Sequence, residues 1–180
     1  MPPPLDPDDE ATLVRKARWG DGPAFDTLYR RHASAVYTLA YRLTGSGSAA
    51  EDITQDTFLR MLQFLHGFRD GAPLRPWLKR VASNAAIDRL RRERTRAQVE
   101  LDDGLPGSTA ASSDAAVADD LLRQLAPLAR TLVWLHSMEG WTHAELGARF
   151  GQSPSWSKSI VSRALARLRD TLTQDEEEHR

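Results

Sequence analysis

The chain has 180 residues, with 24 Lys and Arg against 25 Asp and Glu, and it contains no cysteine. The lack of cysteine excludes disulfide frameworks and Cys-ligated zinc. No apolar run approaches the roughly 20 residues that span a bilayer, and the acidic, proline-rich start "MPPPLDPDDE" does not resemble a secretion signal. We therefore expect a cytoplasmic protein without a membrane-inserted segment.

Charge is segregated along the chain, although the net charge is close to zero. Residues 69–96 carry nine basic side chains and three acidic ones. Residues 97–120 carry six carboxylates and no Lys or Arg, and are otherwise mostly small residues. Residues 121–169 are basic again. This composition predicts two basic modules joined by an acidic linker.

Helical spacing of apolar residues begins near the N-terminus, and strand patterns are nearly absent. The stretch "DDEATLVRKARWG" predicts a short amphipathic helix whose acidic start suits the helix dipole. A longer helix follows in "PAFDTLYRRHASAVYTLAYRLTG", with Pro23 in its first turn and Gly45 at its end. His32 lies on the apolar stripe of this helix, so we predict a packed core histidine rather than a ligand.

The next predicted helix covers residues 49–65 and carries apolar residues on several sides. One side carries Ile53, Thr57, Met61 and Phe64, which suffices for docking onto neighbouring helices. A second row, at steps of three, four and three residues, mixes polar and apolar side chains: Asp52, Gln55, Leu59 and Leu62. This row suits contact with a partner protein, but a central helix wrapped by its own bundle explains it equally well.

The stretch "PWLKRVASNAAIDRLRRERTR" continues the basic module as a fourth helix. Leu74, Leu78, Val81 and Ala85 form its core-facing stripe. A second row lies off that stripe, at steps of four, three and four residues: Arg80, Asn84, Ile87 and Arg91. Its two guanidinium groups can hold phosphates, and the amide between them offers a donor and an acceptor to a base edge. The row predicts nucleic-acid binding, with an ordinary solvated face as the alternative.

The last basic stretch carries the pattern of a helix-turn-helix. Thr142 and Glu145 form a capping box, and Gly151 ends a first short helix. Ser153 then caps a second helix that has Pro154 at its first position. Two helices joined by a three-residue turn that contains glycine are typical of this motif.

The second of these helices has an apolar and a polar face. The residues expected to face inward are Val161, Ala164, Leu165, Leu168 and Leu172. The outer face carries Trp156, Ser159 and Arg163, with Lys158 and Ser162 beside them. Such a face suits the major groove of DNA, where Arg can bind guanine and Ser or Lys can reach bases or phosphates. An ordinary helical hairpin is the alternative.

Patterns of catalytic sites are absent from the sequence. No glycine-rich loop is followed by Lys and Ser or Thr, and "GSGSA" at residues 45–49 lacks the order of a nucleophile elbow. The five histidines are scattered, with no helical pair at ligand spacing beside a carboxylate. We therefore expect a protein that is not an enzyme and has no metal site and no cofactor.

Three motifs, in this order, resemble a known family. The first, "AEDITQDTFLRML", resembles the polymerase-binding helix, region 2.2, of the extracytoplasmic-function (ECF, group IV) sigma factors of the sigma-70 family. "LRPWLKRVASNAAIDRLRR" resembles regions 2.3 and 2.4, and "MEGWTHAELGARFGQSPSWSKSIVSRALARLR" resembles region 4. The resemblance extends from Asp9 to Leu172, and the family consists of compact bacterial transcription initiation factors.

The resemblance implies an all-α fold with two small helical domains. The expected segments are an N-terminal tail and short helix at 1–22, a region 2 helical bundle at 23–96, a flexible acidic linker at 97–120, a region 4 helix-turn-helix domain at 121–172 and an acidic tail at 173–180. In the family the linker threads toward the active centre of the polymerase. A plain flexible spacer is the alternative from composition.

The resemblance also implies a function, which is to bind core RNA polymerase, to read the minus-35 and minus-10 elements of promoter DNA and to help melt the duplex. The positions that grip the clamp helices of the polymerase correspond here to Asp52, Gln55, Asp56, Phe58 and Leu62. The positions expected to pack region 4 and meet the flap tip of the polymerase are Leu121, Leu122, Leu125, Leu128, Leu132 and Leu135. An anti-sigma factor or another regulator is a further expected partner.

The DNA-reading positions lie on two helices. Together with the basic row described above, the resemblance implies minus-10 contacts at Arg80, Asn84, Ile87, Arg91 and Arg92. The preceding loop, "HGFRDGAPL", is expected to pocket a flipped-out base. The implied minus-35 contacts are Thr142, His143, Trp156, Lys158, Ser159, Ser162 and Arg163.

Some residues depart from the family pattern. Trp156, Ser157 and Ile160 stand where threonine, valine and arginine are common, so the minus-35 preference is expected to be unusual. No role follows for Trp19, Trp141 or the acidic tail. Two other functions stay open: a stand-alone helix-turn-helix regulator that binds duplex DNA by itself, and an adaptor that binds polymerase or a regulator without touching bases.

Overall fold

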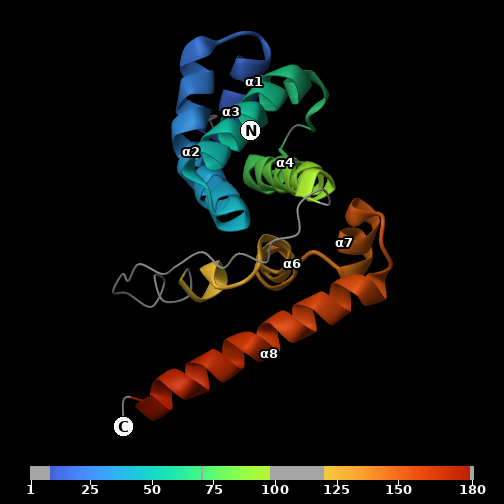
Figure 1. Ribbon diagram of the computed structural model, residues 1–180. Coiled ribbons are helices and arrows are strands. Elements are labelled where there is room, and N and C mark those ends of the chain that lie inside the picture. Colours follow the sequence, from blue (N-terminus) through green and yellow to red (C-terminus); the bar gives the residue numbers. More distant parts are fainter. Residues whose placement is uncertain (1–8, 70, 98–119, 179–180) are drawn as a thin grey trace. The chain divides into compact units, whose positions relative to one another are not determined.

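The computed structural model describes residues 9–69, 71–97 and 120–178 (Figure 1). The helices in chain order are α1 (Glu10–Arg18), α2 (Gly22–Thr44), α3 (Gly47–Phe64), the 3-10 helix η1 (Leu65–Gly67), α4 (Leu74–Ala97), α6 (Pro127–Ser137), α7 (His143–Phe150) and α8 (Pro154–Glu178). A further helical turn lies at residues 120–123, and no strand occurs in the ranges given above. The all-α prediction is therefore confirmed. Apart from its two end residues, the acidic linker lies outside the described residues.

Contacts divide the chain into two units. The first contains residues up to 41 together with 46–86, and the second contains 42–45 together with all residues from 87 onward. The division falls within α4, whose first half belongs to one unit and whose second half belongs to the other. The linker boundaries predicted at residues 97 and 120 were based on charge and composition. The grouping by contacts instead divides the chain between residues 86 and 87.

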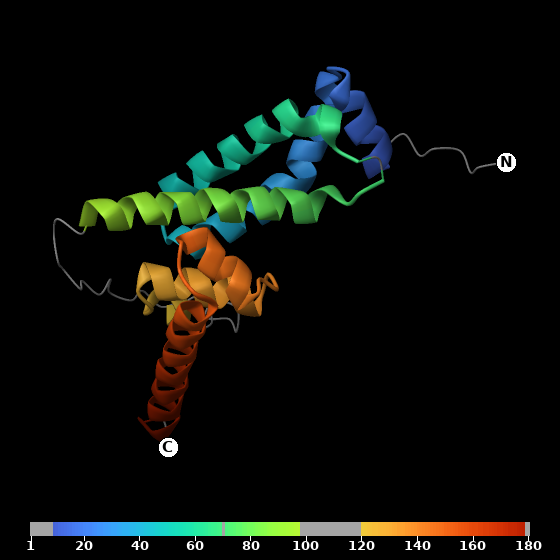
Figure 2. The same ribbon diagram turned by 90° about the vertical axis from the view of Figure 1, so that its right-hand side faces the viewer.

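The first unit is a helical bundle with a tightly packed apolar core. Its fully buried side chains come from α2, α3, η1 and the first half of α4, which Figure 2 shows running beside one another. They include Leu28, Val36, Met61, Leu65, Leu74 and Leu78. The periodic apolar residues of the sequence therefore meet in one core, and α4 is held on it by its N-terminal leucines.

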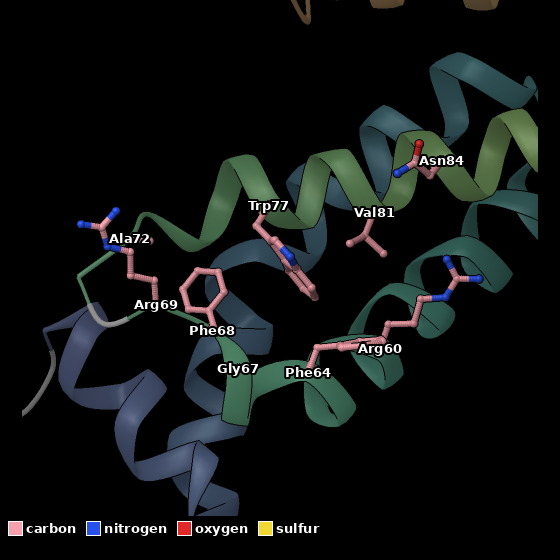
Figure 3. A pocket seen from close by; sticks show the side chains of 9 residues that line it. All are labelled: Arg60, Phe64, Gly67, Phe68, Arg69, Ala72, Trp77, Val81 and Asn84. Atoms are coloured by element: carbon pink, nitrogen blue, oxygen red, sulfur yellow. The ribbon is translucent and has the colours of Figure 1, made fainter. Parts of the chain in front are cut away.

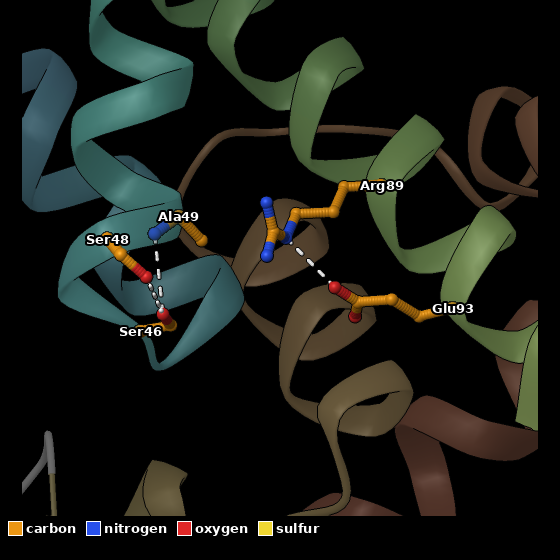
Figure 4. Close-up of polar contacts among 5 residues, drawn as sticks. All are labelled: Ser46, Ser48, Ala49, Arg89 and Glu93. Carbon is orange, nitrogen blue, oxygen red and sulfur yellow. Dashed lines mark hydrogen bonds and ion pairs between the residues drawn. The ribbon is translucent and has the colours of Figure 1, made fainter.

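The turn between α2 and α3 follows from its small and polar residues. Gly45 has a φ of 70°, which favours glycine, and it follows the last residue of α2 as expected. The Ser46 hydroxyl accepts a hydrogen bond from the backbone N–H of Ala49 at 3.3 Å and lies 3.1 Å from the Ser48 hydroxyl (Figure 4). This N-cap satisfies one of the free N–H groups at the start of α3.

Glu10, at the first position of α1, ties three helices together. Its Oε1 accepts a hydrogen bond from the backbone N–H of Leu74 at 2.9 Å, which caps the start of α4. Its Oε2 lies 2.9 Å from Nε2 of His32 on α2. His32 is 7% exposed, which confirms the prediction of a packed core histidine. The short N-terminal helix therefore fixes where α4 begins.

The helix-turn-helix at α7 and α8 has the caps that the sequence predicts. The Thr142 hydroxyl accepts from the N–H of Glu145, and the Glu145 carboxylate accepts from the N–H of Thr142, so the capping box is confirmed. Gly151 adopts a φ of 66° and ends α7. The Ser153 hydroxyl accepts from the N–H of Trp156 at 3.3 Å, directly before α8.

Gly147 is needed for the close approach of the turn to α7. A Cβ at this position would lie 2.7 Å from the carbonyl oxygen of Gln152 and 2.9 Å from the carbonyl carbon and oxygen of Ser153. The N–H of Gln152 also donates to the carbonyl of Gly147 at 2.8 Å. The sequence contains this glycine within a helical pattern, but only the packing of the turn explains it.

Helix α8 is longer than predicted. It continues to Glu178, six residues beyond the expected domain end at Leu172, and Leu172 is 43% exposed. The prediction that Leu172 faces inward is therefore wrong. With 25 residues, α8 is roughly 37 Å long, whereas α6 with 11 residues is only roughly 16 Å long, so its last turns extend past the helix on which it packs.

The described ranges contain neither a membrane-spanning helix nor a group of metal ligands. Within residues 9–69, 71–97 and 120–178, no helix combines the length and apolar character needed to cross a membrane. Among the same residues, no group of three or more His, Cys, Asp or Glu side chains is placed to hold a metal ion.

Helix α4 carries an ordinary exposed ion pair, Arg89 Nε to Glu93 Oε1 at 2.9 Å (Figure 4).

Candidate functional sites

A pocket of about 580 Å³ lies in the first unit, between the end of α3, the segment that follows it and α4 (Figure 3). Its lining residues come from these three places: Arg60 and Phe64 on α3, Gly67, Phe68, Arg69 and Ala72 in the connecting segment, and Trp77, Val81 and Asn84 on α4. The loop expected to pocket a base contributes four of these nine residues. Arg80, the neighbouring basic residue of α4, is exposed.

The pocket has aromatic walls and polar ends. The rings of Phe68 and Trp77 meet edge to face, with centroids 5.9 Å apart and planes at 75°. Figure 3 shows Arg60 and Asn84 at one end and Arg69 at the opposite end. Aromatic faces stack on bases, amides hydrogen-bond to base edges, and guanidinium groups bind phosphates. The arrangement fits one unstacked nucleotide.

Arg18 of α1 binds the segment between α3 and α4 that lines the pocket, which is called the pocket segment below. Its Nε donates to the carbonyl of Leu65 at 2.9 Å, and one of its terminal nitrogens donates to the carbonyl of Phe68 at 2.6 Å. These carbonyls belong to the first residue of η1 and to the residue that follows it, and the Leu65 carbonyl also accepts from the backbone N–H of Phe68 at 3.2 Å. Nothing in the sequence pattern distinguishes Arg18 from the other basic residues of α1, so its role becomes visible only in the fold.

The basic row on α4 is only partly present. Arg80, Arg91 and Arg92 are exposed and Asn84 is half-buried, as a DNA-facing row requires. Ile87 is fully buried, so the prediction that it lies off the core is wrong and it leaves the candidate interface. The helical wheel assumed one buried stripe along the whole helix. In the second half of α4 the buried side instead includes Ile87 and Leu90, on a different side from Leu74 and Leu78.

Helix α3 presents an uncovered face to one side of the first unit. Asp52, Gln55, Asp56 and Leu62 are exposed, and Leu59 is 56% exposed. Of the two explanations left open by periodicity, a helix wrapped all round by its bundle does not hold among the described residues. Its two exposed leucines, bordered by carboxylate and amide side chains, suit a protein-binding face, where an apolar centre has a polar rim.

Phe58 does not belong to that face. It is 3% exposed, and its ring packs against Tyr29 at 4.7 Å and Phe25 at 6.4 Å between centroids. The prediction of direct contact with a partner is therefore wrong for Phe58. Its position on α3 lies between the exposed row and the buried side. The two α2 rings pack against the Phe58 ring and cover it. Phe58 therefore belongs to the core that packs beneath the exposed face of α3.

The outer face of α8 has the side chains expected of a recognition helix. Lys158, Ser159, Ser162 and Arg163 are exposed. Trp156 is only half-exposed, because its ring packs on Phe150 of α7 with centroids 5.4 Å apart. Lys158 and Arg163 therefore provide the cations of this surface, and the two serines provide the hydroxyl groups.

Thr142 and His143, at the start of α7, are mainly engaged within the unit. The Thr142 hydroxyl serves the capping box, although the residue is exposed. The His143 ring stacks on His136 with centroids 4.1 Å apart, and its Nδ1 lies 3.2 Å from the hydroxyl of the buried Ser157. Loss of solvent, followed by the charges of His136 and Lys158, lowers the pKa of His143. Its imidazole is therefore neutral near pH 7 and offers a hydrogen bond rather than a charge.

Trp141, for which the sequence indicated no role, packs inside the second unit. It is 3% exposed, its N–H donates to the carbonyl of Leu135, and its own carbonyl lies 2.8 Å from Nδ1 of His136. Trp141 therefore joins α6 to the start of α7. Of the leucines expected to pack this region, Leu125, Leu132 and Leu135 are buried.

Comparisons with known proteins match both units. The family model of Sigma-70 region 2 matches residues 28–96, and that of Sigma-70 region 4 matches residues 116–168. The RNA polymerase sigma factor CarQ of Myxococcus xanthus is 34% identical over 165 residues, which cover 88% of this chain and 95% of CarQ. The ECF RNA polymerase sigma factor SigM of Mycobacterium tuberculosis is 32% identical over 161 residues, covering 88% of this chain and 82% of SigM.

A solved structure, that of CnrH in complex with the cytosolic domain of CnrY, shares the fold. Its TM-score is 0.53 at 26% identity, and the match covers 92% of this chain and 98% of that one. The pocket and the basic residues of α4 fall within the region 2 match, and α7 with the outer face of α8 falls within the region 4 match.

Proposed function

The chain belongs to the extracytoplasmic-function RNA polymerase sigma factors of the sigma-70 family, and we propose that it is a group IV factor that directs core RNA polymerase to promoters. The observation that carries this proposal is the aromatic-walled pocket that α4 helps to line, with the exposed Arg80 on the same part of this helix. Such a factor acts in the cytoplasm and is not an enzyme, because RNA synthesis belongs to the polymerase.

In this proposal the residues matched by the region 2 family model open the minus-10 element. One base leaves the stack and enters the pocket, where Phe68 and Trp77 receive its faces and Asn84 contacts its edge. Extrusion of a base costs a few kcal/mol, which stacking in a preformed pocket offsets. Arg80, Arg91 and Arg92 bind the flanking phosphates and hold the strand along α4, without themselves reading sequence.

The second unit reads the minus-35 element in this proposal. Helix α8 enters the major groove with Arg163 and Lys158 facing DNA, and Ser159 and Ser162 provide further contacts. The half-buried Trp156 and the neutral His143 stabilise the start of the helix and border the interface. Phosphate contacts from an arginine at position 160 are lost, because this chain has an isoleucine there.

Core polymerase binds through the uncovered face of α3 in this proposal. Asp52, Gln55, Asp56 and Leu62 contact the clamp helices, while the region 4 unit meets the flap tip. CnrH has been solved with the cytosolic domain of CnrY bound, which supports a protein regulator, such as an anti-sigma factor, for this chain as well.

The proposal is tested by run-off transcription with core polymerase and a genomic promoter library. We expect promoter-specific transcripts only when the chain is present. Replacing Asn84 and Arg163 by alanine should abolish them while core binding persists. If the double variant transcribes normally, the chain acts as an adaptor that does not touch bases. If the chain alone binds a duplex operator tightly, it is a stand-alone regulator.

A further inference from the structure

Trp19 is the most exposed large apolar side chain among the described residues. It is 80% exposed and follows the last residue of α1. Its ring contacts that of His66 edge to face, with centroids 6.1 Å apart and planes at 80°. His66 is exposed as well. Because the two rings stand nearly at right angles, they do not stack on each other, and the indole keeps most of its surface open to solvent.

The Trp19–His66 pair is joined directly to the pocket described above. His66 precedes Gly67 and Phe68, which line the pocket, so its Cα lies about 3.8 Å from that of a lining residue. Arg18, the residue before Trp19, donates hydrogen bonds to the carbonyls of Leu65 and Phe68. The aromatic pair is thus tied to the segment that lines the pocket, through the chain at His66 and through the two hydrogen bonds of Arg18.

The charges around the pair favour a polyanion. The sequence "RKARW" brings Arg15, Lys16 and Arg18 to the last turn of α1 beside Trp19, with no carboxylate among these five residues. Arg69, three residues after His66 in the chain, lies at the end of the pocket opposite Asn84 (Figure 3). Open aromatic rings bordered by cations are the usual composition of surfaces that bind single-stranded nucleic acid.

We propose that Trp19, supported by His66, stacks on a second unpaired base of the promoter strand, next to the base held in the pocket. This inference rests on the proposed function and adds a positioning element to it. A strand that leaves the pocket past Gly67 meets the indole, and stacking there keeps the strand from returning to the duplex. A single aromatic platform does not distinguish the four bases strongly, because every base has a face to stack.

The test uses the full chain assembled with core RNA polymerase and a promoter obtained from the run-off library. The promoter is prepared as an intact duplex and as a template pre-opened over the minus-10 element, in which each unpaired nucleotide is replaced in turn by an abasic one. The variants are Trp19→Ala, Trp19→Phe and His66→Ala. Met138→Ala, which removes another exposed apolar side chain in the second unit, is the matched control. Affinities for both templates and for core polymerase are measured by fluorescence anisotropy.

We expect Trp19→Ala to weaken binding of the pre-opened template by about tenfold, with little change on the duplex, and Trp19→Phe to retain most of the affinity. One abasic template should lack the base on which Trp19 stacks. On that template the wild-type chain and Trp19→Ala should bind with equal affinity. Unchanged affinity of Trp19→Ala for every pre-opened template overturns the inference. An equal loss on duplex and opened templates does so too, and a loss of core binding assigns the surface to a protein contact instead. If the wild-type chain confers no promoter binding on core polymerase, the proposed function itself fails.

Discussion

Replacing Gly147 by alanine is expected to destabilise the helix-turn-helix unit by about 1–2 kcal/mol. The added Cβ would lie 2.7 Å and 2.9 Å from backbone atoms of Gln152 and Ser153, which cannot rotate away as a flexible side chain could. Overpacking of this kind costs roughly 1–3 kcal/mol, and three contacts below 3 Å place the cost in the upper part of that range. Alanine recovers up to about 1 kcal/mol through its better helix propensity.

Thermal unfolding of the full chain, followed by circular dichroism, measures this effect. The expected loss corresponds to a fall in Tm of roughly 4–16 °C for a unit of this size. The matched control is Ala148→Gly, at an exposed position of the same helix, which removes only helix propensity and should cost up to about 1 kcal/mol. A Gly147→Ala variant that unfolds at or above the wild-type temperature would refute the close-approach argument.

Three further predictions concern the other contacts. Glu10→Ala should lower the free energy of unfolding by about 1–3 kcal/mol, since it removes the cap of α4 and the partner of a buried histidine; in urea titrations Glu10→Gln should lose less. Asp52→Ala with Gln55→Ala should weaken core polymerase binding at least tenfold while the chain stays folded, and unaltered affinity in a pull-down titration would remove that face from the interface. The pKa of His143 is lowered in the fold, so below about pH 6.5 this histidine binds more protons in the unfolded chain than in the folded one. The free energy of unfolding should therefore fall as pH drops through that range. In urea titrations at pH 7.5 and 5.5, the difference between the two free energies should be smaller for His143→Asn than for the wild-type chain.

Local features of the helix-turn-helix could be predicted from sequence because each depends on neighbours in the chain. The capping box at Thr142 and Glu145 joins residues three apart, and Gly151 ends α7 through its own backbone conformation. Such interactions need no knowledge of the tertiary fold. The same holds for the apolar stripe of α2, whose periodicity also placed His32 in the core correctly.

Two residues assigned to exposed surfaces are buried. Ile87 was assigned by a helical wheel, which treats each helix as having one buried side of constant width. Phe58 was assigned by the family resemblance. In the fold, Phe58 is covered by the rings of Phe25 and Tyr29 from α2, and the buried side of α4 changes along its length to include Ile87. Which neighbour covers a residue at the edge of the apolar stripe depends on tertiary packing and does not follow from spacing.

Contacts between distant parts of the chain were also beyond prediction. Arg18 binds carbonyls 47 and 50 residues away, and Glu10 caps a helix that starts 64 residues later. Arginine and glutamate are common on helix surfaces, so their identity alone carries no such information. Both residues lie on α1, and together they position the pocket segment and the helix that lines it.

The most direct test of the central claim is strand opening at a promoter. Permanganate reactivity of thymines across the minus-10 element should be measured with core polymerase alone, with the wild-type chain added, and with a Trp77→Ala variant that removes one wall of the pocket. We expect reactive thymines within that element only when the wild-type chain is present, and a strongly reduced signal for Trp77→Ala despite normal core binding. If no promoter opens beyond the level of core polymerase alone, or if Trp77→Ala opens promoters as well as wild type, the account is contradicted.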